Sequence, residues 1–65
     1  MIGEYDRVRI IKTDISGIVV DIFEKNGRTL YTVESDEKGV PGGFGADDDW
    51  KLFTCTREEL EELPQ

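Results

Sequence analysis

The dipeptide Asn26-Gly27 lies between two runs rich in β-branched and aromatic residues, and it most constrains how this chain can fold. Asn-Gly accepts the two positive φ values of a type I′ turn, whose twist matches that of the flanking strands. Residues 18–24 precede the turn and residues 29–35 follow it, and both segments have strand-forming composition. The sequence therefore predicts a β-hairpin at its centre.

Two further segments have strand character. In residues 5–12, Val8 and Ile10 alternate with neighbours of the opposite face, which is the period-two pattern of a half-buried strand. Residues 50–55 resume this character after a long interruption, and alternation places Leu52 toward the core. The sequence thus predicts four strands.

The end of the chain carries the signals of one helical turn. Thr56 is suited to the N-cap position, and Glu59 stands where a capping box has its carboxylate. Leu60 and Leu63 are three residues apart, so a helical turn would direct both toward the core. Pro64 ends the turn.

Residues 36–49 form a long loop that contains four glycines, one proline and three consecutive aspartates. Loops of this length in a compact domain are usually either functional or disordered. Because glycines cost much entropy to order and neighbouring carboxylates repel, we expect residues 39–48 to be the most mobile segment.

The expected core consists of the apolar positions that alternation and the final turn direct inward. A chain of 65 residues has room for one domain with a thin core. Gly17, after the turn-forming residues 13–16, is able to adopt a positive φ or to form a bulge. The expected core residues are Ile10, Ile18, Val20, Ile22, Val33, Leu52 and Leu60.

These elements predict a mostly β fold for the single domain of residues 1–65. Short strands, a tight hairpin, one long loop and a capped turn favour a small SH3-like barrel of four to five antiparallel strands with one short C-terminal helical turn. A four-stranded meander with an exposed edge is the alternative.

Four short motifs follow one another along residues 4–63. They are Asp6-Arg7-Val8, Gly17-Ile18-Val19-Val20-Asp21-Ile22, Tyr31-Thr32-Val33-Glu34, and Arg57-Glu58-Glu59-Leu60 after the last strand. In this order they resemble short bacterial SH3-like barrel proteins, many of which have no characterised function. The resemblance implies the fold and no catalytic residue. The chain departs from the pattern in its long acidic loop and in the short length left for a closing strand.

The residues that common catalytic sites need are missing. The chain has no histidine, so the usual proton shuttle and the commonest metal ligand are absent. Its single cysteine, Cys55, stands between two threonines that offer no activating cation, and we expect it to be a small buried residue. The aspartates at 47–49 lack the spacing of a calcium loop, and no Lys-Ser/Thr follows the glycines. The sequence therefore predicts no enzyme activity, no cofactor and no metal.

The charge balance limits the classes of partner. Fifteen acidic and eight basic residues give a formal charge of −7, which repels phosphate backbones and anionic lipids. The charge therefore disfavours nucleic acid as a partner, and we expect no membrane partner. Arg7, Arg9 and Lys12 are interpreted as the solvent-exposed face of an edge strand. The chain lacks the basic start and apolar run of a secretory signal as well as any stretch that could span a bilayer, so we expect a cytoplasmic location.

The candidate partner-binding residues lie in and beside the acidic loop. Phe44 is isolated among glycines and is difficult to explain as core, whereas Trp50, together with Phe53, could simply fill the core. SH3-like barrels can present aromatic residues between loops, where peptides dock. The candidate site is Phe44, Asp47, Asp48, Asp49 and Trp50.

Two functions are consistent with these residues. The first is a non-catalytic protein-binding module whose partner has a basic surface and whose affinity depends on Phe44 and Trp50. The alternative is an acidic antitoxin, immunity protein or inhibitor that mimics nucleic acid, whose binding should collapse in salt. A barrel without a full closing strand is also expected to be able to form a homodimer through a strand edge.

Overall fold

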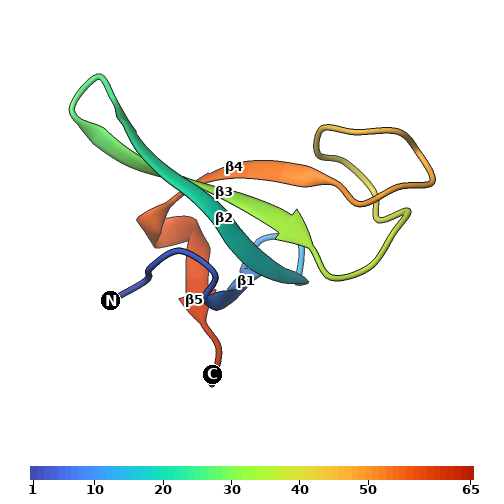
Figure 1. Cartoon of the computed structure of the whole chain (residues 1–65), viewed down its shortest axis with the longest axis horizontal. Helices are drawn as coiled ribbons and strands as arrows, with labels where there is room; N and C mark the ends of the chain where they lie inside the picture. The colour runs from blue at the N-terminus through green and yellow to red at the C-terminus, as the bar shows by residue number, and fades with distance from the viewer.

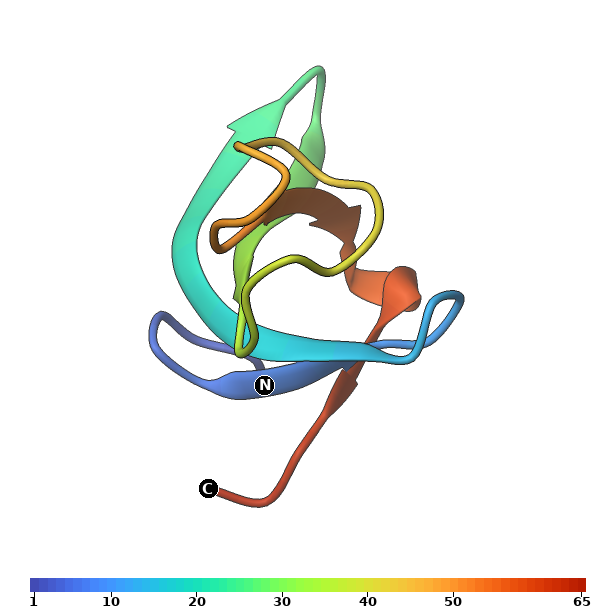
Figure 2. The same ribbon diagram turned by 90° about the vertical axis from the view of Figure 1, so that its right-hand side faces the viewer.

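The computed structural model describes residues 1–65 with five antiparallel strands, β1 (Arg7–Ile10), β2 (Ile15–Lys25), β3 (Arg28–Ser35), β4 (Leu52–Thr56) and β5 (Leu60–Glu62). They form one sheet with the strand order β4-β3-β2-β1-β5 (Figure 1). A 3-10 turn, η1 (Arg57–Glu59), joins β4 to β5. Figure 2 shows the sheet curled on itself, with β2 sweeping in one arc from the hairpin to the base, where it lies beside β1. The expected mostly β, SH3-like architecture is confirmed. No helix has the length and apolar character needed to cross a membrane.

The central hairpin forms at the expected position. Asn26 and Gly27 have φ values of 53° and 77°, and Lys25 pairs with Arg28 to close the two-residue turn. These two positive φ values are the ones that the Asn-Gly sequence accepts. Figure 1 shows this hairpin and the loop of residues 36–49 at opposite ends of the sheet.

A β-bulge at Val20 determines which side chains of β2 face inward. Val19 pairs with Val33 of β3, but the next pair joins Asp21 to Thr32, so Val20 has no partner. One additional residue reverses the alternation of side chains between the two faces of a sheet. The core-facing residues of β2 therefore have odd numbers before the bulge, as Val19 does, and even numbers after it, as Ile22 does.

Because of this bulge, two residues of β2 that were expected in the core lie elsewhere. Val19 faces the core before the bulge, so Ile18 points to the opposite face and is 36% exposed. Val20, at the bulge itself, is only half-buried. Ile22 follows the bulge and packs against the core as expected.

The expected inward face of β4 is also wrong. Phe53 pairs with Val33, and Cys55 pairs with Tyr31, on the inner side of the sheet. Leu52, which was expected in the core, lies on the outer side and is 36% exposed. The aromatic residue that packs against the core from β4 is therefore Phe53.

The core lies on the inner side of the curled sheet and includes a residue that precedes the first strand. Ile10, Val33 and Leu60 are buried as expected. Ile2 is only 4% exposed, so the segment before β1 contributes to the core as well. The buried hydrophobic residues are Ile2, Val8, Ile10, Val19, Tyr31, Val33, Cys55 and Leu60.

Gly17 allows β2 to approach β3 closely. A Cβ atom at this position would overlap the carbonyl oxygen of Glu34 and would lie 2.8 Å from Cγ1 of Val33. Gly17 uses neither of the two options that glycine has at this point of the chain, since its φ is not positive and it forms no bulge. A glycine inside a strand here serves close backbone approach.

The capped turn is confirmed but is shorter than a helix. The backbone N–H of Thr56 donates a hydrogen bond to Oε1 of Glu59 at 2.7 Å, which forms the expected capping box. The turn then ends, and Leu60 enters β5 in extended conformation. Leu60 is buried and Leu63 is half-buried, so the two leucines do not form one helical face.

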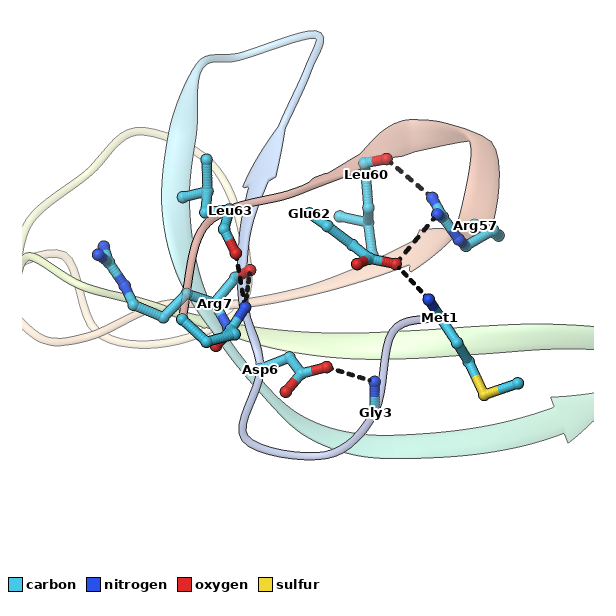
Figure 3. A network of polar contacts seen from close by, with 9 residues as sticks. Met1, Gly3, Asp6, Arg7, Arg57, Leu60, Glu62 and Leu63 are labelled. Atoms are coloured by element: carbon cyan, nitrogen blue, oxygen red, sulfur yellow. Dashed lines mark hydrogen bonds and ion pairs between the residues drawn. The ribbon is translucent and has the colours of Figure 1, made fainter.

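The closing strand β5 pairs with β1 and makes polar contacts with β1, with the 3-10 turn and with the amino terminus (Figure 3). The backbone N–H of Leu63 donates to the carbonyl oxygen of Arg7 at 3.0 Å. Arg57 Nη1 donates to the carbonyl oxygen of Leu60 at 3.1 Å, and the amino group of Met1 lies 2.9 Å from Oε1 of Glu62. The short chain end thus supplies the closing strand usual in the fold.

Candidate functional site

A row of exposed side chains crosses the outer face of the sheet. The register aligns Ile18 of β2 with Glu34 of β3, and Glu34 with Leu52 of β4. Arg7 pairs with Ile18 at one end, and Phe44 pairs with Leu52 at the other through an isolated bridge. Directly paired residues share a face, so these side chains lie on one line. We call Phe44, Leu52, Glu34, Ile18 and Arg7 the outer row.

The apolar members of the outer row are accessible, and their backbone is fixed. Phe44 is 80% exposed. Its backbone N–H donates to the carbonyl oxygen of Leu52 at 2.7 Å, and the N–H of Leu52 donates back at 2.9 Å. Ile18 lies in the middle of the sheet, bonded to strands on both sides. Exposed apolar side chains on rigid elements are typical of interaction surfaces.

The buried side chain of Lys51 is hydrogen-bonded to the backbone of the loop of residues 36–49. This lysine is only 5% exposed, and its Nζ donates to the carbonyl oxygens of Val40 and Gly42 at 3.3 and 3.1 Å. Its backbone N–H donates to Oγ of Ser35 at 3.0 Å. Because a buried ammonium group needs acceptors, the loop folds over the lysine. The greater mobility of residues 39–48 stays a prediction.

Trp50 and the aspartates form the second part of the candidate site. Trp50 is 47% exposed, so it does not fill the core, and Nζ of Lys38 lies 4.3 Å from its ring centroid. Oδ1 of Asp49 accepts a hydrogen bond from the backbone N–H of Trp50 at 2.8 Å. Asp47 and Asp48 are exposed in the same loop. One face of the Trp50 ring thus holds the ammonium group of Lys38, within a loop rich in acidic residues.

The structure adds four residues to the site that the sequence predicted. Phe44 and Trp50 are both exposed, and the other members of the outer row, Leu52, Glu34, Ile18 and Arg7, extend the surface across the sheet. Alternation had assigned the two aliphatic residues to the core. Val19 and Phe53, which pair with the buried Val33, take the inner face instead, and only the register of the folded sheet reveals this.

The basic residues near the outer row are paired with carboxylates. Nη2 of Arg7 lies 2.5 Å from Oδ2 of Asp36. Arg9 contacts Glu61 at 2.6 Å and Asp14 at 2.9 Å, and hydrogen bonds to these two groups, Glu61 first, raise the pKa of its guanidinium. Glu34 has no ion-pair partner. The surface around the apolar side chains therefore keeps an acidic character.

Cys55 lies on the inner face of β4 and is 5% exposed. Burial, with a smaller contribution from the charge of Glu59, raises the pKa of its thiol to about 11. Because the thiolate is the reactive form, the native thiol is a poor nucleophile near neutral pH. This burial agrees with the small buried residue that the sequence predicts.

The surface has two shallow hollows away from Phe44 and Trp50. The larger has a volume of about 460 Å³ and lies between Asp14 and Asp36, with Arg7 at its wall. The smaller, of about 370 Å³, lies between Arg28 and Arg57 above Tyr31. No group of three or more His, Cys, Asp or Glu side chains is placed to hold a metal ion.

Comparison of the chain with family models, curated proteins and solved structures finds no match. The resemblance to bacterial SH3-like barrel proteins therefore stays a prediction beyond the fold. Function has to be argued from the residues of this chain.

Proposed function

We propose that this domain is a non-catalytic protein-binding module whose partner docks on the outer row and on Trp50. The outer row carries the proposal, because Phe44, Leu52 and Ile18 present apolar side chains in line on a hydrogen-bonded sheet. Protein interfaces combine a few such apolar anchors with a polar rim. No partner needs to enter a deep pocket on this surface.

The charge of the domain defines the chemistry of the partner. The net charge is −7, and Glu34, whose carboxylate forms no ion pair, lies between two apolar members of the outer row. Complementary charge accelerates encounter and excludes wrong partners. The partner is therefore a protein with apolar side chains set among lysines or arginines.

Partner capture with matched variants tests the proposal. Tagged wild-type protein is used to recover a partner from the native host, alongside Phe44→Ala/Ile18→Thr and the control Ile11→Thr. Ile11 is 50% exposed and lies in the turn between β1 and β2, outside the outer row. The double variant should lose the partner and the control should retain it. Equal recovery by all three proteins would refute the proposal.

The second candidate function is that of an acidic inhibitor, antitoxin or immunity protein that occupies a site for nucleic acid. The three consecutive exposed aspartates of residues 47–49 favour it. In this case affinity depends on charge, so binding should collapse when salt rises from about 50 mM to about 500 mM. Substitution of all three aspartates by asparagine separates the two functions: the inhibitor loses its target, whereas the module retains most of its affinity.

Homodimer formation through a strand edge is a separate proposal. The free edge of β4 is hydrogen-bonded to Phe44 at Leu52, and the free edge of β5 is hydrogen-bonded to Arg57 at Leu60. Only the short remaining part of each edge strand is open to pairing with a second copy of the chain. Light scattering at high micromolar concentration tests it, and a monomer there counts against it.

A further inference from the structure

Lys38 lies on the ring of Trp50 within a loop rich in acidic residues. Its Nζ is 4.3 Å from the ring centroid, and it forms no ion pair with an acidic side chain. The neighbouring residues 36 and 37 are both acidic, as are residues 47–49. The ring face is therefore a favourable position for a cation within this acidic loop.

The backbone holds the lysine and the ring together. The N–H of Gly39 donates to the carbonyl oxygen of Asp49 at 3.0 Å, which fixes the chain after Lys38 beside the chain before Trp50. Asp49 also accepts the N–H of Trp50. The contact between Lys38 and the ring is thus built into the loop.

We propose that the ring face of Trp50 on which Lys38 lies receives an arginine side chain of the partner, and that Lys38 occupies this position in the free domain as an internal substitute. This inference rests on the proposed protein-binding function and names one contact of that surface. A guanidinium group stacks on an aromatic face better than an ammonium group, because it is planar and more weakly hydrated.

Displacement of Lys38 is feasible because its contact is exposed. Cation–π contacts at exposed sites change an equilibrium by only about two- to fivefold. The released lysine regains side-chain freedom, and the nearby aspartates remain to attract the incoming cation. The internal lysine therefore weakens binding of the partner's arginine by competition without blocking it.

The test uses the single tryptophan of the chain as a reporter. The indole N–H resonance of Trp50 is followed by NMR while a synthetic peptide, Gly-Ser-Arg-Gly-Arg-Ser-Gly, is added. The same peptide with citrulline in place of arginine controls for shape, because citrulline is neutral. The arginine peptide should shift the indole resonance to saturation, and the citrulline peptide should not.

Two lysine variants separate competition from general charge. Lys38→Met and Lys25→Met each remove one positive charge, but Lys25 stands at the hairpin far from the loop (Figure 1). The Kd of the arginine peptide should be about two- to fivefold lower for Lys38→Met than for Lys25→Met. Equal Kd values, or no saturable shift of the indole resonance up to about 5 mM peptide, overturn the inference.

Failure of this inference is distinguishable from failure of the proposed function. If Phe44→Ala/Ile18→Thr loses the host partner while the two lysine variants behave alike, the module stands and the Trp50 contact is wrong. If the double variant retains the partner, the docking surface itself is wrong.

Discussion

Phe44 and Leu52 exchange two backbone hydrogen bonds, so the loop chain at Phe44 runs against the edge of β4 as a single-residue extension of the sheet. The ring of Phe44 nevertheless stays 80% exposed. The backbone of Phe44 is thus fixed while its side chain is accessible, so a substitution at this residue can change binding without changing the fold.

Phe44→Ala should weaken partner capture and change the free energy of unfolding by less than about 0.5 kcal/mol, because little apolar surface is buried. Val33→Ala is the opposite case: Val33 is fully buried, and its truncation should cost about 2 kcal/mol. Thermal unfolding and a binding assay of both variants check this. A large fall in Tm for Phe44→Ala would show that its ring supports the fold.

Gly17→Ala should destabilise the domain by about 2 kcal/mol or more, because the added methyl group would overlap the backbone of Glu34 between two paired strands. Gly3→Ala is the matched control, since its Cβ would meet only Oδ2 of Asp6 at 3.7 Å. Urea unfolding of the two variants measures the difference. Similar midpoints would mean that β2 and β3 can separate slightly at no cost.

Lys51→Met should loosen the loop of residues 36–49. Methionine keeps an apolar stem but leaves the carbonyl oxygens of Val40 and Gly42 without their donor, at a cost of about 1–3 kcal/mol. Amide exchange should accelerate from residue 39 to residue 49 and stay unchanged in β1. Lys25→Met, at the exposed hairpin, should have no such effect, and unaltered exchange in Lys51→Met would contradict the role assigned to the lysine.

The capping box should make stability depend on pH. Hydrogen bonds from the backbone N–H and then the hydroxyl of Thr56 lower the pKa of Glu59 in the folded chain. Because the folded pKa lies below the unfolded one, this stabilisation is present above the unfolded pKa and is lost as pH falls through the folded pKa. Glu59→Ala should therefore cost about 0.5–1 kcal/mol at pH 7 and progressively less below about pH 4. Denaturant unfolding at pH 7 and below about pH 4, with Glu58→Ala as control, checks this dependence on pH.

Cys55 should react with a thiol reagent only when the domain unfolds. Its thiol is buried and its pKa is raised to about 11, so little thiolate exists at pH 8. Labelling by an aromatic disulfide reagent should be slow in buffer and rapid in denaturant. Fast labelling of the native protein would indicate that β4 opens locally.

The sequence was sufficient for the first four strands and the capped turn, and insufficient for β5 and for the faces of the strands. The Asn26-Gly27 turn and the Thr56 capping box depend on local backbone chemistry, so they could be predicted from a few residues. In β2, apolar residues occur on both faces, and alternation alone cannot choose between them. The bulge at Val20 then reverses the parity, and no local signal marks it.

The candidate site was predicted only in part, because some of its residues lie on strand faces that alternation cannot assign. Phe44 and Trp50 could be identified because glycines and acids isolate them from any apolar pattern. Ile18 and Leu52 could not, since an aliphatic residue in a strand is ordinarily taken as core. Burial of Lys51 was also beyond prediction, because it depends on loop carbonyls whose positions only the folded chain defines.

The closing strand has a consequence for the order in which the sheet assembles. Arg9 and Glu61 meet across β1 and β5 although 52 positions separate them in the chain, whereas the hairpin pairs close neighbours. Closing a long loop costs chain entropy before the new contacts compensate it. Folding should therefore start at the β2–β3 hairpin, with β5 adding last, and the three residues of β5 should be the first to detach when the native protein fluctuates.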